Sequence, residues 1–277
     1  MKKFVSLFIA LVLTVLPMIA LADNGVLTVA LSPDFAPMEF CDTSKSGADM
    51  YVGFDVELAK FIAAELGLTL EIKPMSFDAC QTAVQTGAVD MSISGYSKTD
   101  ERAANFELSD FYYAGDNETQ QSIIVLKDKE GTFSKAEDFS GLVIGAQDAS
   151  LQKDLCESQL PGDITIKLFK DINDAVMSLM TGKIDAIAVA HGNGEAIMAN
   201  NDSIAFSGFD FEVTEDQSNN VILIQKGNTD MLEKVNACLA KAYAEGLYPI
   251  WYKEAKELAG IDTAADISFD EEGNQVG

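Results

Sequence analysis

Two stretches of this sequence, Thr86-Gly87-Ala88-Val89-Asp90 and Thr181-Gly182-Lys183-Ile184-Asp185, share one pattern and lie 95 residues apart. Each follows a segment with helical apolar spacing and leads into a short apolar run, at 91–94 and at 186–189. This is the pattern of a helix end followed by a buried strand. Its duplication predicts two similar α/β lobes. Since ligands settle beyond the carboxyl ends of strands in open α/β sheets, we expect a ligand cleft between the lobes.

Strand and helix signals alternate around both copies, which predicts parallel, doubly wound sheets flanked by helices. The first series comprises strands at 26–31, 68–72 and 91–94, with helices at 53–66 and 78–86. The second comprises strands at 122–126, 142–145, 165–169 and 186–189, with helices at 151–160 and 172–180. The chain then returns through a strand at 221–224 and helices at 231–245 and 249–259.

Two polar stretches without periodicity, 115–119 and 212–219, are the expected crossings between the lobes. Two crossings are typical of a hinge. The resulting division places lobe 1 at 23–116 and 216–260 and lobe 2 at 117–215. An acidic tail at 261–277 is expected to fray.

The first 22 residues have the pattern of a cleavable signal peptide. Lys2 and Lys3 precede an apolar run from Phe4 to Ala20, and Ala20-Leu21-Ala22 has the small residues that signal peptidase needs. The alternative, a membrane anchor, is weaker because the run is short and lacks basic residues behind it. No cysteine follows the run, so a lipid anchor is not indicated. We therefore expect a soluble protein in the periplasm.

The charge of the chain is strongly negative. Cleavage would leave 255 of the 277 residues and, by removing two lysines, take the formal net charge from −25 to −27. The acidic residues are scattered along the chain, which argues against nucleic acid or an anionic membrane as partner. Their simplest interpretation is solubility.

The chain has four cysteines, and in an oxidising compartment they allow three disulfide pairings that sequence cannot separate. We favour Cys41 with Cys80, both near the rim of the cleft in the first lobe. A bridge between Cys156 and Cys238 would instead tie the lobes together. The spacing of the cysteines fits no zinc site, and a single histidine argues against a site of mixed Cys and His ligands, so no metal or cofactor is expected.

The segment Ser94-Gly95-Tyr96-Ser97-Lys98-Thr99-Asp100-Glu101-Arg102 carries the chemistry of an anion site. Small residues at a strand end leave backbone amides open, and Thr99 can cap a helix that carries Arg102 in its first turn. An arginine fork beside hydroxyls and amides suits a carboxylate. The equally weighted alternative is that Thr99 only caps the helix and that Arg102 pairs with Glu101 or Glu107 on the surface.

With these motifs, the sequence resembles the solute-binding proteins of ABC-type polar amino acid uptake, family 3 of the bacterial extracellular binding proteins. The resemblance runs from about Gly25 to Glu257. The segments that carry it are 34–40 (DFAPMEF), 53–59 (GFDVELA), 97–102 (SKTDER) and 108–113 (LSDFYY). It implies the type II periplasmic-binding-protein fold: a monomer with two lobes that closes on its ligand and presents it to an inner-membrane permease.

The resemblance also implies roles for particular residues. Arg102 would hold the ligand α-carboxylate, the second-lobe turn at 147–150 would place a helix N-terminus beside it, and two phenylalanines would flank the ligand side chain. For both phenylalanines, ordinary core packing is the commoner alternative. The full set of expected ligand-binding residues is Phe35, Phe54, Ser94, Gly95, Tyr96, Ser97, Arg102, Gln147, Ser150 and His191.

One position departs from the family pattern. Members that bind amino acids carry an acid five positions after the residue matching Asp185, where it accepts hydrogen bonds from the ligand ammonium; here that position is Ala190. A buried ammonium without an acceptor costs about 1–3 kcal/mol or more. Either Asp148 or Glu195 substitutes, or the ligand is not an ordinary α-amino acid. His191 is a candidate ligand contact, although a surface-loop histidine is an equal alternative.

Three functions fit these observations. The first is a periplasmic receptor for a small carboxylate-bearing solute. The second is a secreted dehydratase-like enzyme on the same scaffold, whose acid or base would come from Asp148, His191 or Glu195. The third is a ligand-sensing subunit for a membrane receptor. No Ser/His/Asp signature, metal spacing or phosphate loop supports an enzyme, so we expect a binding protein.

Overall fold

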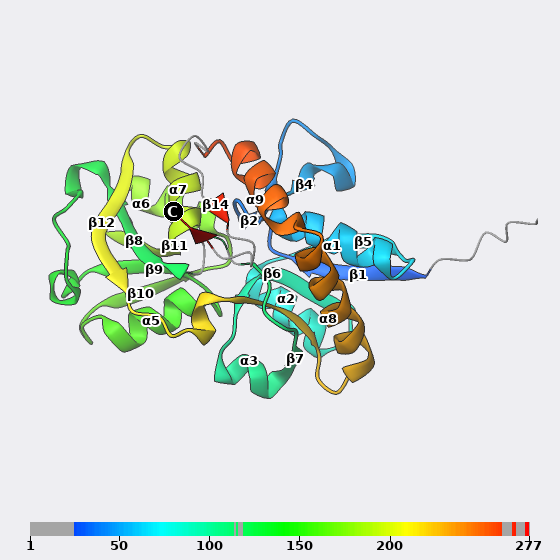
Figure 1. The fold of residues 1–277 in the computed structure, drawn as a ribbon. Helices are drawn as coiled ribbons and strands as arrows, with labels where there is room; N and C mark the ends of the chain where they lie inside the picture. The colour runs from blue at the N-terminus through cyan, green and yellow to red at the C-terminus, as the bar shows by residue number, and fades with distance from the viewer. Residues whose placement is uncertain (1–24, 114, 116–118, 262–267, 270–274, 277) are drawn as a thin grey trace, which may run out of the picture.

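The chain folds into two five-stranded sheets, each flanked by helices (Figure 1). The computed structural model describes residues 25–113, 115, 119–261, 268–269 and 275–276. The expected signal peptide therefore lies outside the described residues, as do most of the acidic tail and part of the stretch 115–119.

The first sheet has the strand order β5-β1-β6-β13-β7. Strands β5, β1 and β6 are parallel to one another, whereas β13 runs antiparallel to both β6 and β7. The bounds of these strands are β1 Val26–Leu31, β5 Thr69–Pro74, β6 Met91–Ser97, β7 Phe106–Leu108 and β13 Asn220–Gln225.

The second sheet repeats this plan in the order β10-β9-β11-β8-β12. Strands β10, β9 and β11 are parallel, and β8 runs antiparallel to β11 and β12. The bounds are β8 Gln121–Leu126, β9 Val143–Gln147, β10 Thr165–Phe169, β11 Ala186–Ala190 and β12 Ile204–Phe211.

Each sheet is thus mostly parallel, as the expected fold class requires, and one strand of each, β13 or β8, runs antiparallel to its neighbours. Strand β8 is the first strand after the chain reaches the second sheet, and β13 is the first after it returns. A parallel neighbour needs a helical crossover on the same sheet, and a strand that arrives from the other lobe has none.

Helices cover both faces of each sheet. In the first lobe, Ile222 and Ile224 of β13 face the cluster that contains α1, α8 and α9, while Val221 and Leu223 face α2. This alternation is the two-residue period of a buried strand. The helix bounds are α1 Phe54–Glu65, α2 Phe77–Gln85, α3 Asp100–Asn105, α8 Thr229–Ala244 and α9 Leu247–Leu258.

The second lobe is built in the same way. Ile124 and Ile187 pack toward α6, whereas Ile123 and Ala186 pack toward α5. The cluster on the α6 side is continuous with the core of the first lobe, so apolar packing crosses the boundary between the lobes. The helix bounds are α5 Leu151–Gln159, α6 Ile172–Met180 and α7 His191–Ala199.

The duplicated segment, at 86–90 and 181–185, has the same structure in both lobes. Gly87 and Gly182 end α2 and α6 with φ angles of 71° and 68°, a conformation that glycine adopts without steric cost. The aspartate of each copy then accepts a hydrogen bond from the neighbouring parallel strand: Asp90 from the Thr28 amide at 2.7 Å, and Asp185 from the Val143 amide at 2.8 Å. The repeat therefore joins a helix end to the start of the sheet.

Several elements were not predicted. Helix α7 begins in the glycine-containing stretch that was expected to be a loop, and β12 follows it. Lobe 1 also carries a small sheet and a short 3-10 helix between β1 and α1, and Asp34 of this small sheet reaches Gln147 of the second lobe. These are β2 Asp34–Phe35, β3 Glu39–Cys41, η1 Gly47–Met50 and β4 Tyr51–Val52. Further short elements are η2 Lys127–Lys129, η3 Ala136–Phe139 and η4 Asp216–Ser218, and β14 Ser268–Phe269 pairs with β15 Gln275–Val276.

Replacing the first repeat aspartate tests its structural role. The Asp90 carboxylate also accepts a hydrogen bond from the Thr28 hydroxyl at 2.6 Å, so Asp90→Ala leaves the Thr28 amide without its acceptor. We expect the free energy of unfolding to fall by about 1–3 kcal/mol, measured by urea denaturation. Asp202→Ala, at an exposed turn, is the control and is expected to leave stability unchanged. Equal stability of the two variants would contradict this role.

Candidate functional site

A small cavity lies where the carboxyl ends of β6 and β9 face each other across the lobe boundary. Lobe 1 supplies the end of β6, strand β2 and the start of α2 and α3, and lobe 2 supplies the end of β9 and the first turn of α5. The lining residues are Phe35, Phe77, Ser94, Gly95, Ser97, Arg102, Gln147, Leu151 and Gln152. Six of the ten predicted ligand-binding residues are therefore brought together here.

Arg102 is the only arginine of the chain and is buried at this cavity. Thr99 caps α3 by accepting the Arg102 amide at 3.2 Å, as expected, and this positions the side chain. The guanidinium donates to the Ser97 carbonyl at 2.7 Å and lies 5.6 Å and 5.3 Å from the ring centroids of Phe77 and Tyr96. Such cation–π contacts hold the planar group in one orientation. The alternative of a surface ion pair with Glu101 or Glu107 is wrong for this buried side chain.

The polar groups at the end of β6 are held by two buried acids of lobe 1. The Ser94 hydroxyl donates to the Glu39 carboxyl, and the Gly95 amide donates to Asp55 at 2.9 Å. The Tyr112 hydroxyl donates to the same Asp55 oxygen at 3.1 Å. The amide of Gly95, which the sequence analysis expected to be open, is thus already bonded, and the acids fix the loop that carries the cavity wall.

Both acids titrate above their usual range. Complete burial raises the pKa of Asp55 to about 7, against the opposing hydrogen bonds from Gly95 and Tyr112. Burial, and secondarily the charge of Asp55, raises the pKa of Glu39 well above the ordinary glutamate value. Two carboxylates this close disfavour joint ionisation, so the pair retains a proton near neutral pH.

The second-lobe wall is the N-terminus of α5. Ser150 caps this helix: its hydroxyl accepts the Lys153 amide at 3.2 Å and donates to the Gln147 carbonyl at 2.8 Å. Leu151 and Gln152, in the first turn, line the cavity. The positive end of the α5 dipole therefore faces the same space as the Arg102 guanidinium, an arrangement suited to an anion.

Hydrogen bonds join the lobes around the cavity. Arg102 donates to the Ala149 carbonyl at 3.2 Å, Gln147 donates to Asp34 at 3.0 Å, and Lys170 pairs with Asp78 at 2.5 Å. The cavity measures about 20 Å³, little more than one water molecule requires. A ligand of amino-acid size therefore requires the lobes to move apart before it enters.

Two aromatic side chains from lobe 1 line the cavity, and one of them was not predicted. Phe35 lies directly against Gly95, whose φ of 57° and close contact with the ring exclude a larger side chain. Phe77, at the start of α2, is the ring that sequence reasoning missed. The sequence feature that could have identified it is its position after β5, as the first residue of the helix that faces the cleft.

The other predicted phenylalanine lies elsewhere. Phe54 is fully buried in an aromatic core, 6.1 Å from Tyr112 and 5.6 Å from Tyr248 between ring centroids, and it does not line the cavity. Tyr96 also stays behind the wall: its hydroxyl lies 2.9 Å from the Ser92 hydroxyl and its ring stacks on Phe77.

His191 starts α7 and faces β8 and β12 of its own lobe. Its ring stacks on Phe206 with centroids 4.2 Å apart, and Nδ1 lies 2.9 Å from the Ser122 hydroxyl. Because Ser122 donates its hydrogen to Asp210 at 2.6 Å, His191 Nδ1 is the donor of that contact, so this trio lacks the hydrogen bonding of a nucleophilic serine. Neither His191, Asp148 nor Glu195 lines the cavity, and Ala190 is a buried methyl.

All four cysteines are free thiols, so the favoured Cys41–Cys80 disulfide is wrong for this structure. Cys80 lies on the buried face of α2, where burial raises its pKa to about 12, whereas Cys41 is half-buried on β3 in the small sheet. Cys156 packs in the α5 core, and Cys238 packs with α8 in the first lobe. The four side chains belong to separate packing environments.

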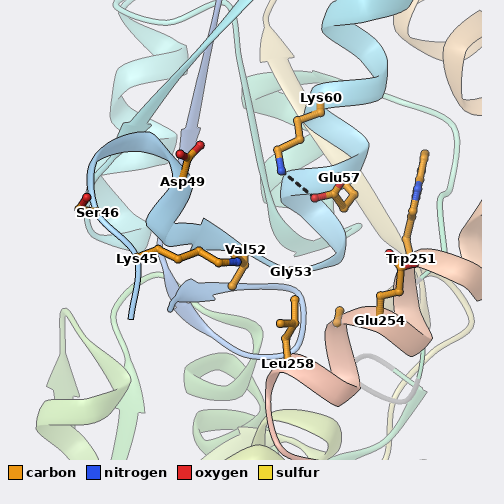
Figure 2. Close-up of a pocket in the computed structure, with 11 residues that line it drawn as sticks. Lys45, Ser46, Asp49, Val52, Gly53, Glu57, Lys60, Trp251, Glu254 and Leu258 are labelled. Carbon is orange, nitrogen blue, oxygen red and sulfur yellow. Dashed lines mark hydrogen bonds and ion pairs between the residues drawn. The ribbon is translucent and has the colours of Figure 1, made fainter. Parts of the chain in front are cut away.

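A wider hollow of about 500 Å³ lies between η1, α1 and α9 of lobe 1 (Figure 2). Side chains of both charges surround it, two lysines and three acids, and Lys60 pairs with Glu57 at 2.7 Å. It contains none of the predicted ligand-binding residues.

In the part of the chain that the structure describes, no group of three or more His, Cys, Asp or Glu side chains is arranged to hold a metal ion. Within the same residues, no helix has the length and apolar character needed to cross a membrane.

The fold and the cavity define a two-lobed binding protein. Residues 27–257 match the model of the bacterial extracellular solute-binding proteins, family 3, and the chain belongs to this family. The expected family and fold class are thereby confirmed.

Among curated relatives, the chain is 28% identical to the arginine-binding extracellular protein ArtP of Bacillus subtilis over 89% of this chain and 94% of that protein. It is 26% identical to the L-cystine-binding protein TcyJ of Escherichia coli over 81% and 80%. A similar solved structure is that of the amino acid ABC transporter substrate-binding protein AbpA from Streptococcus pneumoniae bound to L-arginine. That chain has a TM-score of 0.78, 31% identity, and coverage of 86% of this chain and 97% of that one.

The raised pKa of Glu39 generates a stability prediction. A carboxyl whose pKa is higher in the folded state binds more protons there. It therefore destabilises the folded protein increasingly as pH rises from the pKa of the carboxyl in the unfolded chain toward its pKa in the folded protein. We expect Glu39→Gln to raise the midpoint of thermal unfolding at pH 8 and to leave it nearly unchanged at pH 4.5. The exposed Glu233→Gln is the control. A midpoint at pH 8 no higher than that of the control would contradict the buried-acid assignment.

Proposed function

We propose that this protein captures a small carboxylate-bearing solute, an amino acid or a close relative, between its lobes. The observation that carries the proposal is the geometry at Arg102: a buried guanidinium and the N-terminus of α5 come from opposite lobes and face one cavity. A carboxylate suits both groups, because charge-assisted, bidentate hydrogen bonds to arginine are about twice as strong as neutral ones. The relatives described as arginine-binding and cystine-binding proteins support an amino acid as the solute.

Closure follows from this arrangement. In the closed structure, the Arg102 guanidinium reaches across the boundary to the Ala149 carbonyl, which is neutral. A ligand carboxylate at this position would supply a full negative charge to both lobes at once. It would therefore bind the closed state more tightly than the open state and shift the population toward closure.

The ten residues of the predicted set fall into three groups. Arg102, Ser97 and Gln147 are the polar groups of the cavity wall that face the ligand, and Phe35 stands beside them. Ser94, Gly95, Tyr96 and Ser150 shape the wall through the hydrogen bonds and stacking already described. Phe54 and His191 support the packing of their own lobes.

The wider role follows from the family. We propose that the mature protein lies outside the cytoplasmic membrane, in the periplasm, after removal of its first 22 residues. There it would act as a monomer and present its ligand to the permease of an ABC transporter. Lobe 1 would comprise residues 23–116 and 216–260, and lobe 2 residues 117–215. In this role, the protein binds and releases its ligand without changing it chemically.

Substitution of Arg102 tests the proposal. A thermal-shift screen of the mature protein against the amino acids and small carboxylates first identifies the compound that raises the unfolding midpoint, since a ligand of the native state must do so. For that compound, we expect Arg102→Ala to weaken binding by at least about 100-fold in isothermal titration calorimetry, because a charged hydrogen bond is lost in a buried site.

Two controls make the result specific. Lys98→Ala removes an exposed cation, paired with Asp216, from the same loop and is expected to keep full affinity. Circular dichroism checks that the Arg102 variant is folded. Unchanged affinity in a folded Arg102→Ala protein would rule out the carboxylate clamp.

A further inference from the structure

Asp34, on strand β2 of lobe 1, makes two hydrogen bonds to the second lobe. One of its carboxylate oxygens accepts the Gln147 side-chain amide at 3.0 Å, at the end of β9, and the Ile172 backbone amide at 2.8 Å, at the start of α6. The other oxygen accepts the Ser32 hydroxyl of its own lobe at 2.8 Å. A single carboxyl of lobe 1 therefore joins two elements of lobe 2 in the closed structure.

This carboxyl is half-buried and lies beside a groove of about 530 Å³ between the lobes. Lobe 1 lines the groove with the chain around β2 and β3, and lobe 2 lines it with α6 and α7. Asp34 itself is part of the groove wall. A proton can therefore reach the carboxyl without the lobes coming apart.

The charges around Asp34 do not favour its ionised form. Its three hydrogen-bond donors are neutral, and the charged group that acts on it is Asp171, another acid, which caps α6 at the Asn173 amide. The lysine of the same turn, Lys170, pairs instead with Asp78 at 2.5 Å.

The other titratable groups that sense Asp34 are also acids. The charge of Asp34 contributes to raising the pKa values of the Glu39 carboxyl and of the Cys41 and Cys80 thiols. Glu39 and Cys41 lie on β3, which pairs with β2, and Cys80 lies on α2. Ionisation of Asp34 therefore adds negative charge to a region that contains other acidic groups.

Lobe closure acts on the ionised carboxyl in two opposing ways. The amides of Gln147 and Ile172 stabilise the charge, whereas burial and the negative charge of Asp171 destabilise it. Burial is the larger effect, and it raises the pKa of Asp34 from the ordinary 3.8 to about 6 in the closed structure. When the lobes separate, water replaces the lobe 2 groups and the pKa returns toward its ordinary value. The closed lobes therefore hold this proton more tightly than the open lobes.

We propose that Asp34 is a proton-linked positioning residue for lobe closure: the closing lobes take up a proton at this carboxyl, so mildly acidic pH favours the closed state and ligand capture. Protonated Asp34 still has an oxygen that accepts hydrogen bonds from Gln147 and Ile172, so the closed geometry is kept while the charge is lost. The inference rests on the proposed function in one respect, that the ligand binds the closed lobes better than the open ones.

The expected size follows from the two pKa values. With 3.8 for the open lobes and about 6 for the closed lobes, ligand affinity rises about 10-fold as pH falls from 8 to 5. The full difference between the two pKa values corresponds to about 100-fold and sets the upper limit. The ammonium and carboxylate of an amino acid and the guanidinium of Arg102 keep their charges over this pH range, so they do not contribute to the change.

Calorimetry of the wild-type protein and of Asp34→Asn tests the proposal. The probe is L-arginine, which the relative AbpA binds, followed by the amino acid that most raises the unfolding midpoint. Each is titrated at pH 5, 6, 7 and 8 in two buffers of different ionisation enthalpy, which reveals proton uptake. For the wild type, we expect about 10-fold tighter binding at pH 5 than at pH 8, with uptake of most of one proton at pH 5. Asp34→Asn, which resembles the protonated carboxyl, is expected to take up no proton and to keep one affinity within about 2-fold.

Two further variants separate the proton link from a merely structural role. Asp42→Asn changes another acid of the same groove, which accepts the Ser44 hydroxyl within its own loop at 2.6 Å, and is expected to keep the wild-type pH dependence. Asp171→Asn keeps a side chain that caps α6 but removes the negative charge that raises the pKa of Asp34. We expect it to make the change in affinity between pH 8 and pH 5 smaller.

Small-angle X-ray scattering reads closure without any ligand. We expect the wild-type radius of gyration to be smaller at pH 5 than at pH 8, and that of Asp34→Asn to be the same at both. The proton link is overturned if wild-type affinity is constant or falls toward pH 5, or if Asp34→Asn keeps the wild-type dependence. If no amino acid binds at any pH, the proposed function fails and scattering alone decides: equal wild-type radii at the two pH values overturn the link.

Discussion

The rest of this structure depends on the contacts that Arg102 makes with both lobes. Its guanidinium is held by the Ser97 carbonyl of its own lobe and the Ala149 carbonyl of the other, and it lies over two aromatic rings. Burying a full charge at a domain boundary is costly unless it has strong partners. The chain places its only arginine there, and the Ser97 and Ala149 carbonyls and the two aromatic rings keep that group in position.

The buried acids near the boundary have two different positions and roles. Glu39 and Asp55 lie behind the cavity wall, hold the end of β6 through Ser94 and Gly95, and retain a proton because both are fully buried. Asp34 lies at the boundary itself and reaches Gln147 of the other lobe.

Much of the architecture could be predicted from sequence because local signals are strong. Helix α6 matches its predicted range since Asp171 caps its start at the Asn173 amide and Gly182 follows its end. Helix α7 was missed because its glycines are typical of a loop; Gly194 is small because the Phe206 ring packs against it. Whether Phe54 or Phe77 lines the cleft, and whether cysteines meet, depends on tertiary packing that no local pattern encodes.

The most direct test is a crystal structure of the mature protein with the amino acid that most raises its unfolding midpoint. The account predicts closed lobes, with the ligand carboxylate within hydrogen-bond distance of the Arg102 guanidinium and the Arg102 contact with the Ala149 carbonyl replaced or shared. A carboxylate bound away from Arg102, for example in the hollow beside Trp251 of lobe 1, would contradict it.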